Sequence, residues 1–166
     1  MTEDLHAERP YMPGYGILTA EEGTGLLPWP LAAERLEASH DYWLATVRPE
    51  RRPHLMPVWG VWLDEALWFT CSNGSRKTRN LRADGQCSLA TDDAEQPVVI
   101  EGVAQVGTKK VDLARMLDAE NAKYGTTYGF EMVDPSHNTC FQVCPTWAFA
   151  LDAADFTGSP TRYRPV

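Results

Sequence analysis

The alternation of apolar and polar positions along the chain predicts short strands with three helices inserted between them. Runs rich in β-branched and aromatic residues, bounded by Gly, Pro, Asp and Asn, are typical of strands. The predicted strands cover residues 42–47, 53–63, 66–71, 86–92, 97–107 and 139–151. The predicted helices cover residues 28–39, 75–84 and 109–124. Short turns between neighbours favour antiparallel pairing, so we expect a mainly β protein built on a small six-stranded antiparallel barrel with flanking helices.

Three local patterns refine this prediction. Residues 53–63 are nearly all apolar, which predicts burial on both faces over part of the strand. Gly102 predicts a bend or bulge, and Pro145 predicts an edge position or a bulge in the last strand. In the third helix, the stripe predicted to face the core contains Val111, Ala114, Leu117 and Asn121, with Met116 beside it.

The chain divides into an N-terminal arm, residues 1–27, and one domain, residues 28–166. The arm alternates turn formers with single large apolar residues and shows no periodicity. Two interpretations are open: its apolar residues pin it onto the body or a partner subunit, or it is a free tail.

Charge narrows the choice of partners. The 166 residues carry a formal net charge of −8 with a sequence pI of about 4.9, and 43% of them are hydrophobic. An acidic field argues against nucleic acid or an anionic membrane surface as the main partner. No apolar run has the length of a membrane span and the first residues do not form a signal peptide, so we expect a cytoplasmic protein.

Four cysteines are present, at positions 71, 87, 140 and 144. Cys140 and Cys144 would lie about 13 Å apart on a strand, too far for a disulfide. No second pair or His cluster completes a zinc site around them. We therefore expect structural cysteines and no metal site.

The most informative stretch follows the third predicted strand and reads Ser75-Arg76-Lys77. A hydroxyl N-cap followed by cations offers free backbone N–H groups, the positive end of a helix dipole and long cationic donors. These features suit a dianionic phosphate. The alternative interpretation is a capped, solvated surface helix.

The succession YWLATV, RPHLMPVWGVW, LWFTC, SRKTRNLRAD, CSLAT and PVVIEGVAQV resembles the split-barrel family of pyridoxamine 5′-phosphate oxidase-like proteins. The resemblance covers residues 28–151 and is greater to the flavin and deazaflavin oxidoreductases of that family. It implies an FMN- or F420-dependent oxidoreductase that transfers hydride to or from a small organic substrate. The Arg and His pair of true pyridoxamine phosphate oxidases has no obvious match, so activity on vitamin B6 phosphates is not expected.

The resemblance also implies where the cofactor lies. The second strand would hold the ring, the end of the third strand would follow the ribityl chain, and the basic turn would grip the phosphate. In that order the cofactor-binding residues are Met56, Pro57, Val58, Trp59, Thr70, Cys71, Ser75, Arg76 and Lys77. The site would lie at the interface of a homodimer, with further ring contacts from the partner's strand start at the positions of Gln96, Pro97 and Val98. No catalytic residue is assigned, because the cofactor carries the chemistry.

Several alternatives stay open. The protein could bind or store flavin or haem without turnover, and His40, His54 and His137 are then the candidate axial ligands. His54 is otherwise a proton donor, a substrate contact or a structural residue. Arg79 and Arg82 either face solvent or receive a longer anionic tail. Trp147 and Tyr163 either pack in the body or cover the cofactor.

Overall fold

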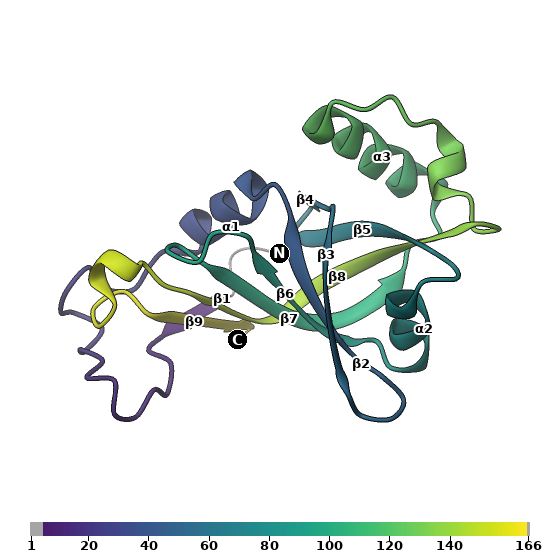
Figure 1. The fold of residues 1–166 in the computed structure, drawn as a ribbon. Helices are drawn as coiled ribbons and strands as arrows, with labels where there is room; N and C mark the ends of the chain where they lie inside the picture. The colour runs from purple at the N-terminus through teal and green to yellow at the C-terminus, as the bar shows by residue number, and fades with distance from the viewer. Residues whose placement is uncertain (1–4, 166) are drawn as a thin grey trace.

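The computed structural model describes residues 5–165 and confirms the predicted fold class, mainly β with antiparallel pairing. The strands are β1 Leu5–Glu8, β2 Tyr42–Val47, β3 Pro53–Val58, β4 Val61–Leu63, β5 Ala66–Ser72, β6 Gln86–Thr91, β7 Val98–Val106, β8 Asn138–Ala150 and β9 Thr161–Pro165. The helices are α1 Trp29–Ala38, α2 Arg76–Ala83 and α3 Lys110–Tyr124, with short 3-10 turns at Phe130–Val133 and Ala153–Asp155. Figure 1 shows α1 and α2 packed on the curled sheet and α3 standing at one margin.

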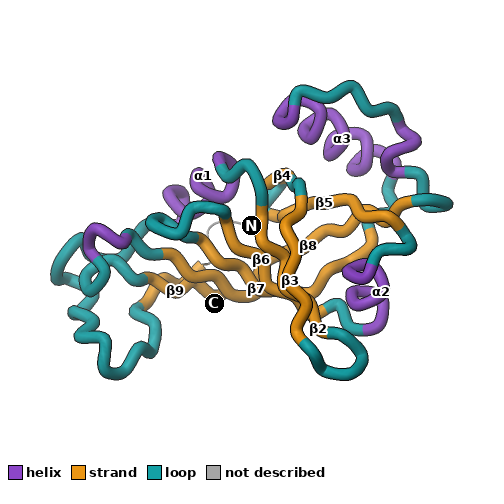
Figure 2. The backbone as a smooth tube through the Cα atoms, viewed as in Figure 1, coloured by secondary structure: helices purple, strands orange, loops and turns teal. Residues whose placement is uncertain are grey.

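The sheet splits along its longest strand. It runs in the order β1-β9-β8-β7-β6-β2-β3, while β4 pairs with β5 and β5 pairs with β8 (Figure 2). One side of β8 pairs with β7 along its length. Its other side pairs first with β5, from Asn138 to Val143, and then with β9, from Ala148 to Ala150. The sheet can therefore curl into a barrel and still extend past it.

The described residues form nine strands rather than the six predicted. Two of the extra strands come from the chain ends, where β1 pairs with β9. The third arises because the predicted strand 53–63 breaks into β3 and β4 at Trp59 and Gly60. Gly60 is buried, and a Cβ there would lie 2.8 Å from the carbonyl oxygen of Trp68, so the close backbone approach needs glycine.

The prediction that part of the strand 53–63 is buried on both faces is wrong for β3. This strand pairs only with β2 and ends the sheet, so Leu55 and Met56 are 56% and 43% exposed. The predicted irregularity at Gly102 is confirmed. The pairing of β7 with β8 shifts between Glu101 and Gly102, where Gly102 faces Pro145. A Cβ on Gly102 would lie 2.5 Å from the carbonyl oxygen of Cys144.

Two apolar clusters fill the body. The larger lies inside the barrel and includes Leu36, Leu44, Leu89, Ile100 and Phe141, all at most 1% exposed. The smaller lies under α3. The predicted inner stripe of α3 is partly wrong: the helix buries Leu113, Met116, Leu117 and Glu120, while Val111 is 65% exposed.

The described part of the N-terminal arm lies against the body rather than apart from it. The guanidinium of Arg9 donates hydrogen bonds to the carbonyl oxygens of Thr19, Gly158 and Pro160 at 2.8–2.9 Å. The backbone N–H and the hydroxyl of Thr24 both donate to the Asp155 carboxylate at 2.6 Å. These bonds tie the arm to the loop before β9.

Candidate functional site

The predicted helix N-cap at Ser75 is confirmed. Its Oγ accepts a hydrogen bond from the N–H of Thr78 at 3.2 Å and donates one to Thr78 Oγ1 at 2.9 Å. The Thr78 hydroxyl then donates to the carbonyl oxygen of Ser72 at 2.9 Å, which closes the turn between β5 and α2. The N–H groups of Arg76 and Lys77 belong to the first helical turn, where no intrahelical acceptor exists, so they can bind an anion.

Four cationic or titratable side chains gather beside this turn: Arg48, His54, Arg76 and Lys77. We call them the basic corner. Burial lowers the pKa of His54, and the charges of Arg48, Lys77 and Arg76 lower it further. Within residues 5–165, neither Arg76 nor Lys77 forms an ion pair with a carboxylate. The corner therefore keeps uncompensated positive charge in a protein of net charge −8.

A buried polar chain links the basic corner to the barrel. Asn80, on the inner face of α2, donates its amide to Thr46 Oγ1 at 2.9 Å. Thr46 Oγ1 lies 3.5 Å from Nδ1 of His54 on the neighbouring strand. Asn80 and Thr46 are almost fully buried. Packing of α2 on β2 thus fixes the helix start relative to β3.

The strand predicted to hold the cofactor ring forms a free edge. Because β3 ends the sheet order, one side of its backbone has no partner strand among the described residues. Met56 lies across from Leu44, on the face that points toward the barrel, and Val58 is buried. Trp59 follows the strand and is 41% exposed. The edge of β3 can therefore offer main-chain groups and the Met56 side chain to a planar ligand.

Thr70 and Cys71 point to opposite faces of β5. Cys71 lies in the barrel core, and burial raises the pKa of its thiol to about 11. Oγ1 of Thr70 is buried without a hydrogen-bond partner in the described part of the chain. The Cys71 side chain is closed to a ligand, so at this position only the backbone is available.

The residues predicted to contact the cofactor ring of a partner subunit differ in burial. Val98 is fully buried in the barrel of its own subunit. Gln96 is exposed, and its amide donates to Asp152 Oδ2 at 3.3 Å. Contact across a dimer could therefore come from Gln96 but not from the Val98 side chain.

Sequence reasoning missed a polar network at the far end of β3. The Tyr124 ring stacks on Trp59 with centroids 4.2 Å apart and planes 3° apart. Its hydroxyl donates to the carbonyl oxygen of His40 at 2.6 Å and accepts from the N–H of Gly60 at 2.8 Å. Nζ of Lys123 donates to the carbonyl oxygen of Gly60 at 2.8 Å and to the Tyr42 hydroxyl at 3.0 Å. The last turn of α3 thereby anchors the break between β3 and β4.

Burial dominates the protonation of this network. It lowers the pKa of Lys123 to about 8, against the opposing effects of Asp41, Asp92, Glu37 and Glu120. It raises the pKa of Tyr124 to about 12 and the pKa of the Glu120 carboxyl. A basic residue before the Gly125 stop is an ordinary helix C-terminal signal, so the sequence held no sign that Lys123 turns inward.

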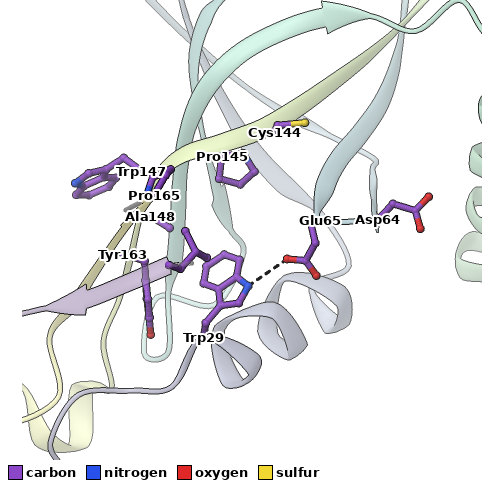
Figure 3. Close-up of a pocket in the computed structure, with 10 residues that line it drawn as sticks. Trp29, Asp64, Glu65, Cys144, Pro145, Trp147, Ala148, Tyr163 and Pro165 are labelled. Atoms are coloured by element: carbon purple, nitrogen blue, oxygen red, sulfur yellow. Dashed lines mark hydrogen bonds between the residues drawn. The ribbon is translucent and has the colours of Figure 1, made fainter. Parts of the chain in front are cut away.

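A sizeable hollow lies elsewhere in the described chain. It has a volume of about 550 Å³ and opens between α1, the turn from β4 to β5, β8 and β9 (Figure 3). It is lined by Leu5, Trp29, Asp64, Glu65, Cys144, Pro145, Trp147, Ala148, Tyr163 and Pro165, and we call it the aromatic pocket. None of the nine predicted cofactor-binding residues lines it. Two of the lining residues, Trp147 and Tyr163, are those for which the sequence leaves open whether they pack in the body or cover the cofactor. Tyr163 packs in the core, and its hydroxyl donates to the carbonyl oxygen of Leu27 at 2.8 Å.

Metal-ligating side chains do not gather within residues 5–165, where no group of three His, Cys, Asp or Glu residues could hold an ion. All four cysteines are free, and only Cys144 is exposed. The described helices include none with the length and apolar character to cross a membrane.

Comparison with known proteins identifies the family. Residues 29–151 match the family described as pyridoxamine 5′-phosphate oxidase, which is most of the chain. The protein therefore belongs to the pyridoxamine 5′-phosphate oxidase-like split-barrel family, as the resemblance in its sequence indicated. This family includes oxidoreductases as well as binding proteins. No curated protein matches the chain.

Solved structures show the same fold. A conserved hypothetical protein of Mycobacterium tuberculosis is 24% identical with a TM-score of 0.66, and the match covers 84% of this chain and 89% of the other. An F420 reductase is 24% identical with a TM-score of 0.57, covering 69% and 93%. A heme-binding protein of Mycobacterium smegmatis is 18% identical with a TM-score of 0.58, covering 77% and 59%. At these identities the likeness concerns the fold alone.

Proposed function

We propose that the protein is a flavin- or deazaflavin-dependent oxidoreductase that transfers hydride to or from a small organic substrate. The observation that carries this proposal is the basic corner. A capped helix start with two unpaired cations lies beside a strand with a free backbone edge. The corner supplies the donors that a cofactor phosphate requires, and the strand supplies groups for a planar ring.

Each structural element would contact a different part of the cofactor. The first-turn N–H groups, Ser75, Arg76 and Lys77 would hold the phosphate, and the backbone at Thr70 and Cys71 would follow the linker to the ring. Main-chain groups from Met56 to Trp59 would orient the ring. When bound, FMN or F420 supplies a ring that accepts or donates hydride. The protein contributes position and exclusion of water, and no side chain is assigned a catalytic role.

The site would be completed by a second copy of the chain. Trp43, Val47, Leu55 and Val103 lie on the outer face of the sheet formed by β3, β2, β6 and β7, and each is at least 42% exposed. Large exposed apolar residues grouped on a sheet face are typical of protein interfaces. We propose that this face forms a homodimer and covers the ring on β3. The likeness to the F420 reductase supports a fold that suits this role. It leaves the choice between FMN and F420 open.

Titration of the purified protein with FMN and with F420, followed by fluorescence and equilibrium dialysis, tests the proposal. We expect one of the two to bind with saturable stoichiometry of one per chain, and its bound form to exchange hydride with an added reductant or oxidant. Failure to bind either would refute the proposal. Binding of both with equal affinity would show that the basic corner recognises only the phosphate group that the two cofactors have in common.

A second candidate function is haem binding without turnover. His54 favours it: its lowered pKa keeps the imidazole neutral near pH 7, the form that binds iron, and Arg76 and Lys77 could bind propionates. One of the structural neighbours is itself named a heme-binding protein. A Soret band after addition of haemin that is lost in H54A would support this function. Unchanged spectra in H54A would exclude His54 as the iron ligand.

A further inference from the structure

The aromatic pocket carries chemistry that the cofactor proposal does not use. Figure 3 shows Tyr163 and Ala148 next to each other, as the pairing of β8 with β9 requires, Pro145 across from Trp29, and the turn of Asp64 and Glu65 at the end. Trp29 and Tyr163 meet edge to face, with centroids 5.2 Å apart. Aromatic and proline walls give a ligand apolar contact on several sides.

The charged residues that line this pocket are acidic. A second hollow of about 530 Å³ shares Trp29, Asp64 and Glu65 with it and adds Glu34 and Glu37 of α1. No lysine, arginine or histidine of the described chain lines either hollow. Two carboxylates thus border the aromatic pocket, whose other lining residues are mostly apolar, and two more border the neighbouring hollow.

One cation approaches the rim, and it is already paired. Arg115 of α3 donates to both carboxylate oxygens of Asp64, at 2.6 and 3.0 Å. The arginines of β9, Arg162 and Arg164, both bind Glu8 and alternate with Tyr163 along the strand, so they lie on its other face. Glu65 therefore keeps an unneutralised charge at the pocket.

Glu65 is held in place at the edge of an indole. Nε1 of Trp29 donates to Glu65 Oε2 at 3.2 Å, the dashed line in Figure 3. This bond leaves Oε1 available to a ligand. A carboxylate positioned next to an aromatic ring attracts a cation with an apolar body, because a cation over the ring face is drawn by the ring quadrupole and by the carboxylate together.

We propose that the aromatic pocket binds an organic cation, a protonated or quaternary amine attached to an apolar group. The amine lies against Glu65 and the Trp29 ring, and the apolar group contacts Leu5 and Pro145, which keep part of their surface exposed. Glu65 repels anions from the pocket, and Glu34 and Glu37 of the neighbouring hollow add negative charge nearby. The proposal stands apart from the cofactor and holds with or without it.

Isothermal titration with three probes of similar body tests the charge preference: benzyltrimethylammonium, benzyl alcohol and phenylacetate. We expect the cation to bind, the alcohol to bind at least about fivefold more weakly and phenylacetate not to bind. Raising NaCl to about 0.5 M should weaken the binding of benzyltrimethylammonium and leave the binding of benzyl alcohol unchanged. Equal affinity for the cation and the alcohol, or no binding of the cation, would overturn the proposal.

The variant E65Q locates the site. Glutamine keeps the size of the side chain and an oxygen for the Trp29 N–H, so the fold should be retained, as far-ultraviolet circular dichroism would show. We expect the affinity for benzyltrimethylammonium to fall about fivefold or more in E65Q. The matched control is E50Q, on the exposed turn between β2 and β3, which should bind as the wild type does. An unchanged affinity in folded E65Q would place the cation elsewhere and refute the assignment.

Discussion

The basic corner and the aromatic pocket differ in charge and in the way the chain assembles them. The corner collects positive side chains on a helix start and a neighbouring hairpin, and two of its residues, Arg76 and Lys77, are consecutive and follow the Ser75 cap. The pocket collects residues from α1, a turn, β8 and β9, spread over most of the sequence. A local signal can reveal the first kind of site from sequence, whereas only the folded barrel brings the second together.

Opposite charge at the two sites also separates their ligands. A phosphate is attracted to Arg76 and Lys77 and repelled by Glu65, and an organic cation has the reverse preference. The break between β3 and β4 joins the two regions, because β3 belongs to the corner and the turn after β4 carries Asp64 and Glu65. The anchor on this break is the network of Lys123 and Tyr124.

The largest effect should come from removing both cations of the helix start. The double variant R76A/K77A loses two charge-assisted hydrogen bonds to phosphate, so we expect the affinity for FMN or F420 to fall about 100-fold or more. Equilibrium dialysis measures this, with K109A as the control for loss of an exposed lysine. Binding of benzyltrimethylammonium should not change. An unaffected cofactor affinity would show that the corner is a solvated surface.

The next effect tests the apolar face beside the corner. In L55E a carboxylate stands in the middle of the proposed interface, where burial of an unpaired charge is costly. We expect a monomer by light scattering at concentrations where the wild type is a dimer, together with weaker cofactor binding. The aromatic pocket should keep its affinity for the organic cation. A dimer that persists in L55E would move the interface elsewhere.

The free energy of unfolding should depend on pH through Lys123, which lies at the break between β3 and β4. Its pKa is lowered on folding, so between about pH 8 and its ordinary value near 10.5 the unfolded chain binds more protons, and the contribution of Lys123 to stability rises with pH. The buried thiols of Cys71, Cys87 and Cys140, with raised pKa values, act in the opposite direction above pH 9. Comparison with K123M cancels the thiol effect.

Urea unfolding of the wild type and K123M from pH 7 to 9.5 measures this contribution. The difference in the free energy of unfolding should move in favour of the wild type by at most about 1.4 kcal/mol per pH unit, less after solvent screening. K109M, which also loses a lysine of the α3 start, serves as the control for net charge. A difference that falls with rising pH would contradict the inward position of Lys123.

The smallest effect on ligand binding concerns the Tyr124 hydroxyl. Y124F keeps the stack on Trp59 but removes the acceptor of the Gly60 N–H and the donor to His40. We expect a loss of about 1–2 kcal/mol in the free energy of unfolding, measured with urea. Cofactor and cation affinities should both decline slightly, because both sites depend on the break at Gly60. A decline at one site alone would show that the break does not couple them.

Some of the structure could be predicted because its signals are local. The strand at 42–47, the Ser75 cap, the Gly125 stop and the bulge at Gly102 each depend on residues within a few positions. Other features depend on distant partners. Continuous apolar sequence at 53–63 predicts a buried strand, but the position of β3 at the sheet end exposes Leu55 and Met56 instead.

The amino-acid sequence by itself determined the antiparallel β class, the family and the cationic helix start, because periodicity, turn residues and capping act over short distances. The tertiary structure alone decided which side chains lie together across the barrel. It turned Cys71 inward, added the chain ends to the sheet as β1 and β9, and placed Lys123 on Gly60. It also set Trp29 beside Glu65, a pair 36 positions apart, because closing a barrel fixes contacts that no local pattern encodes.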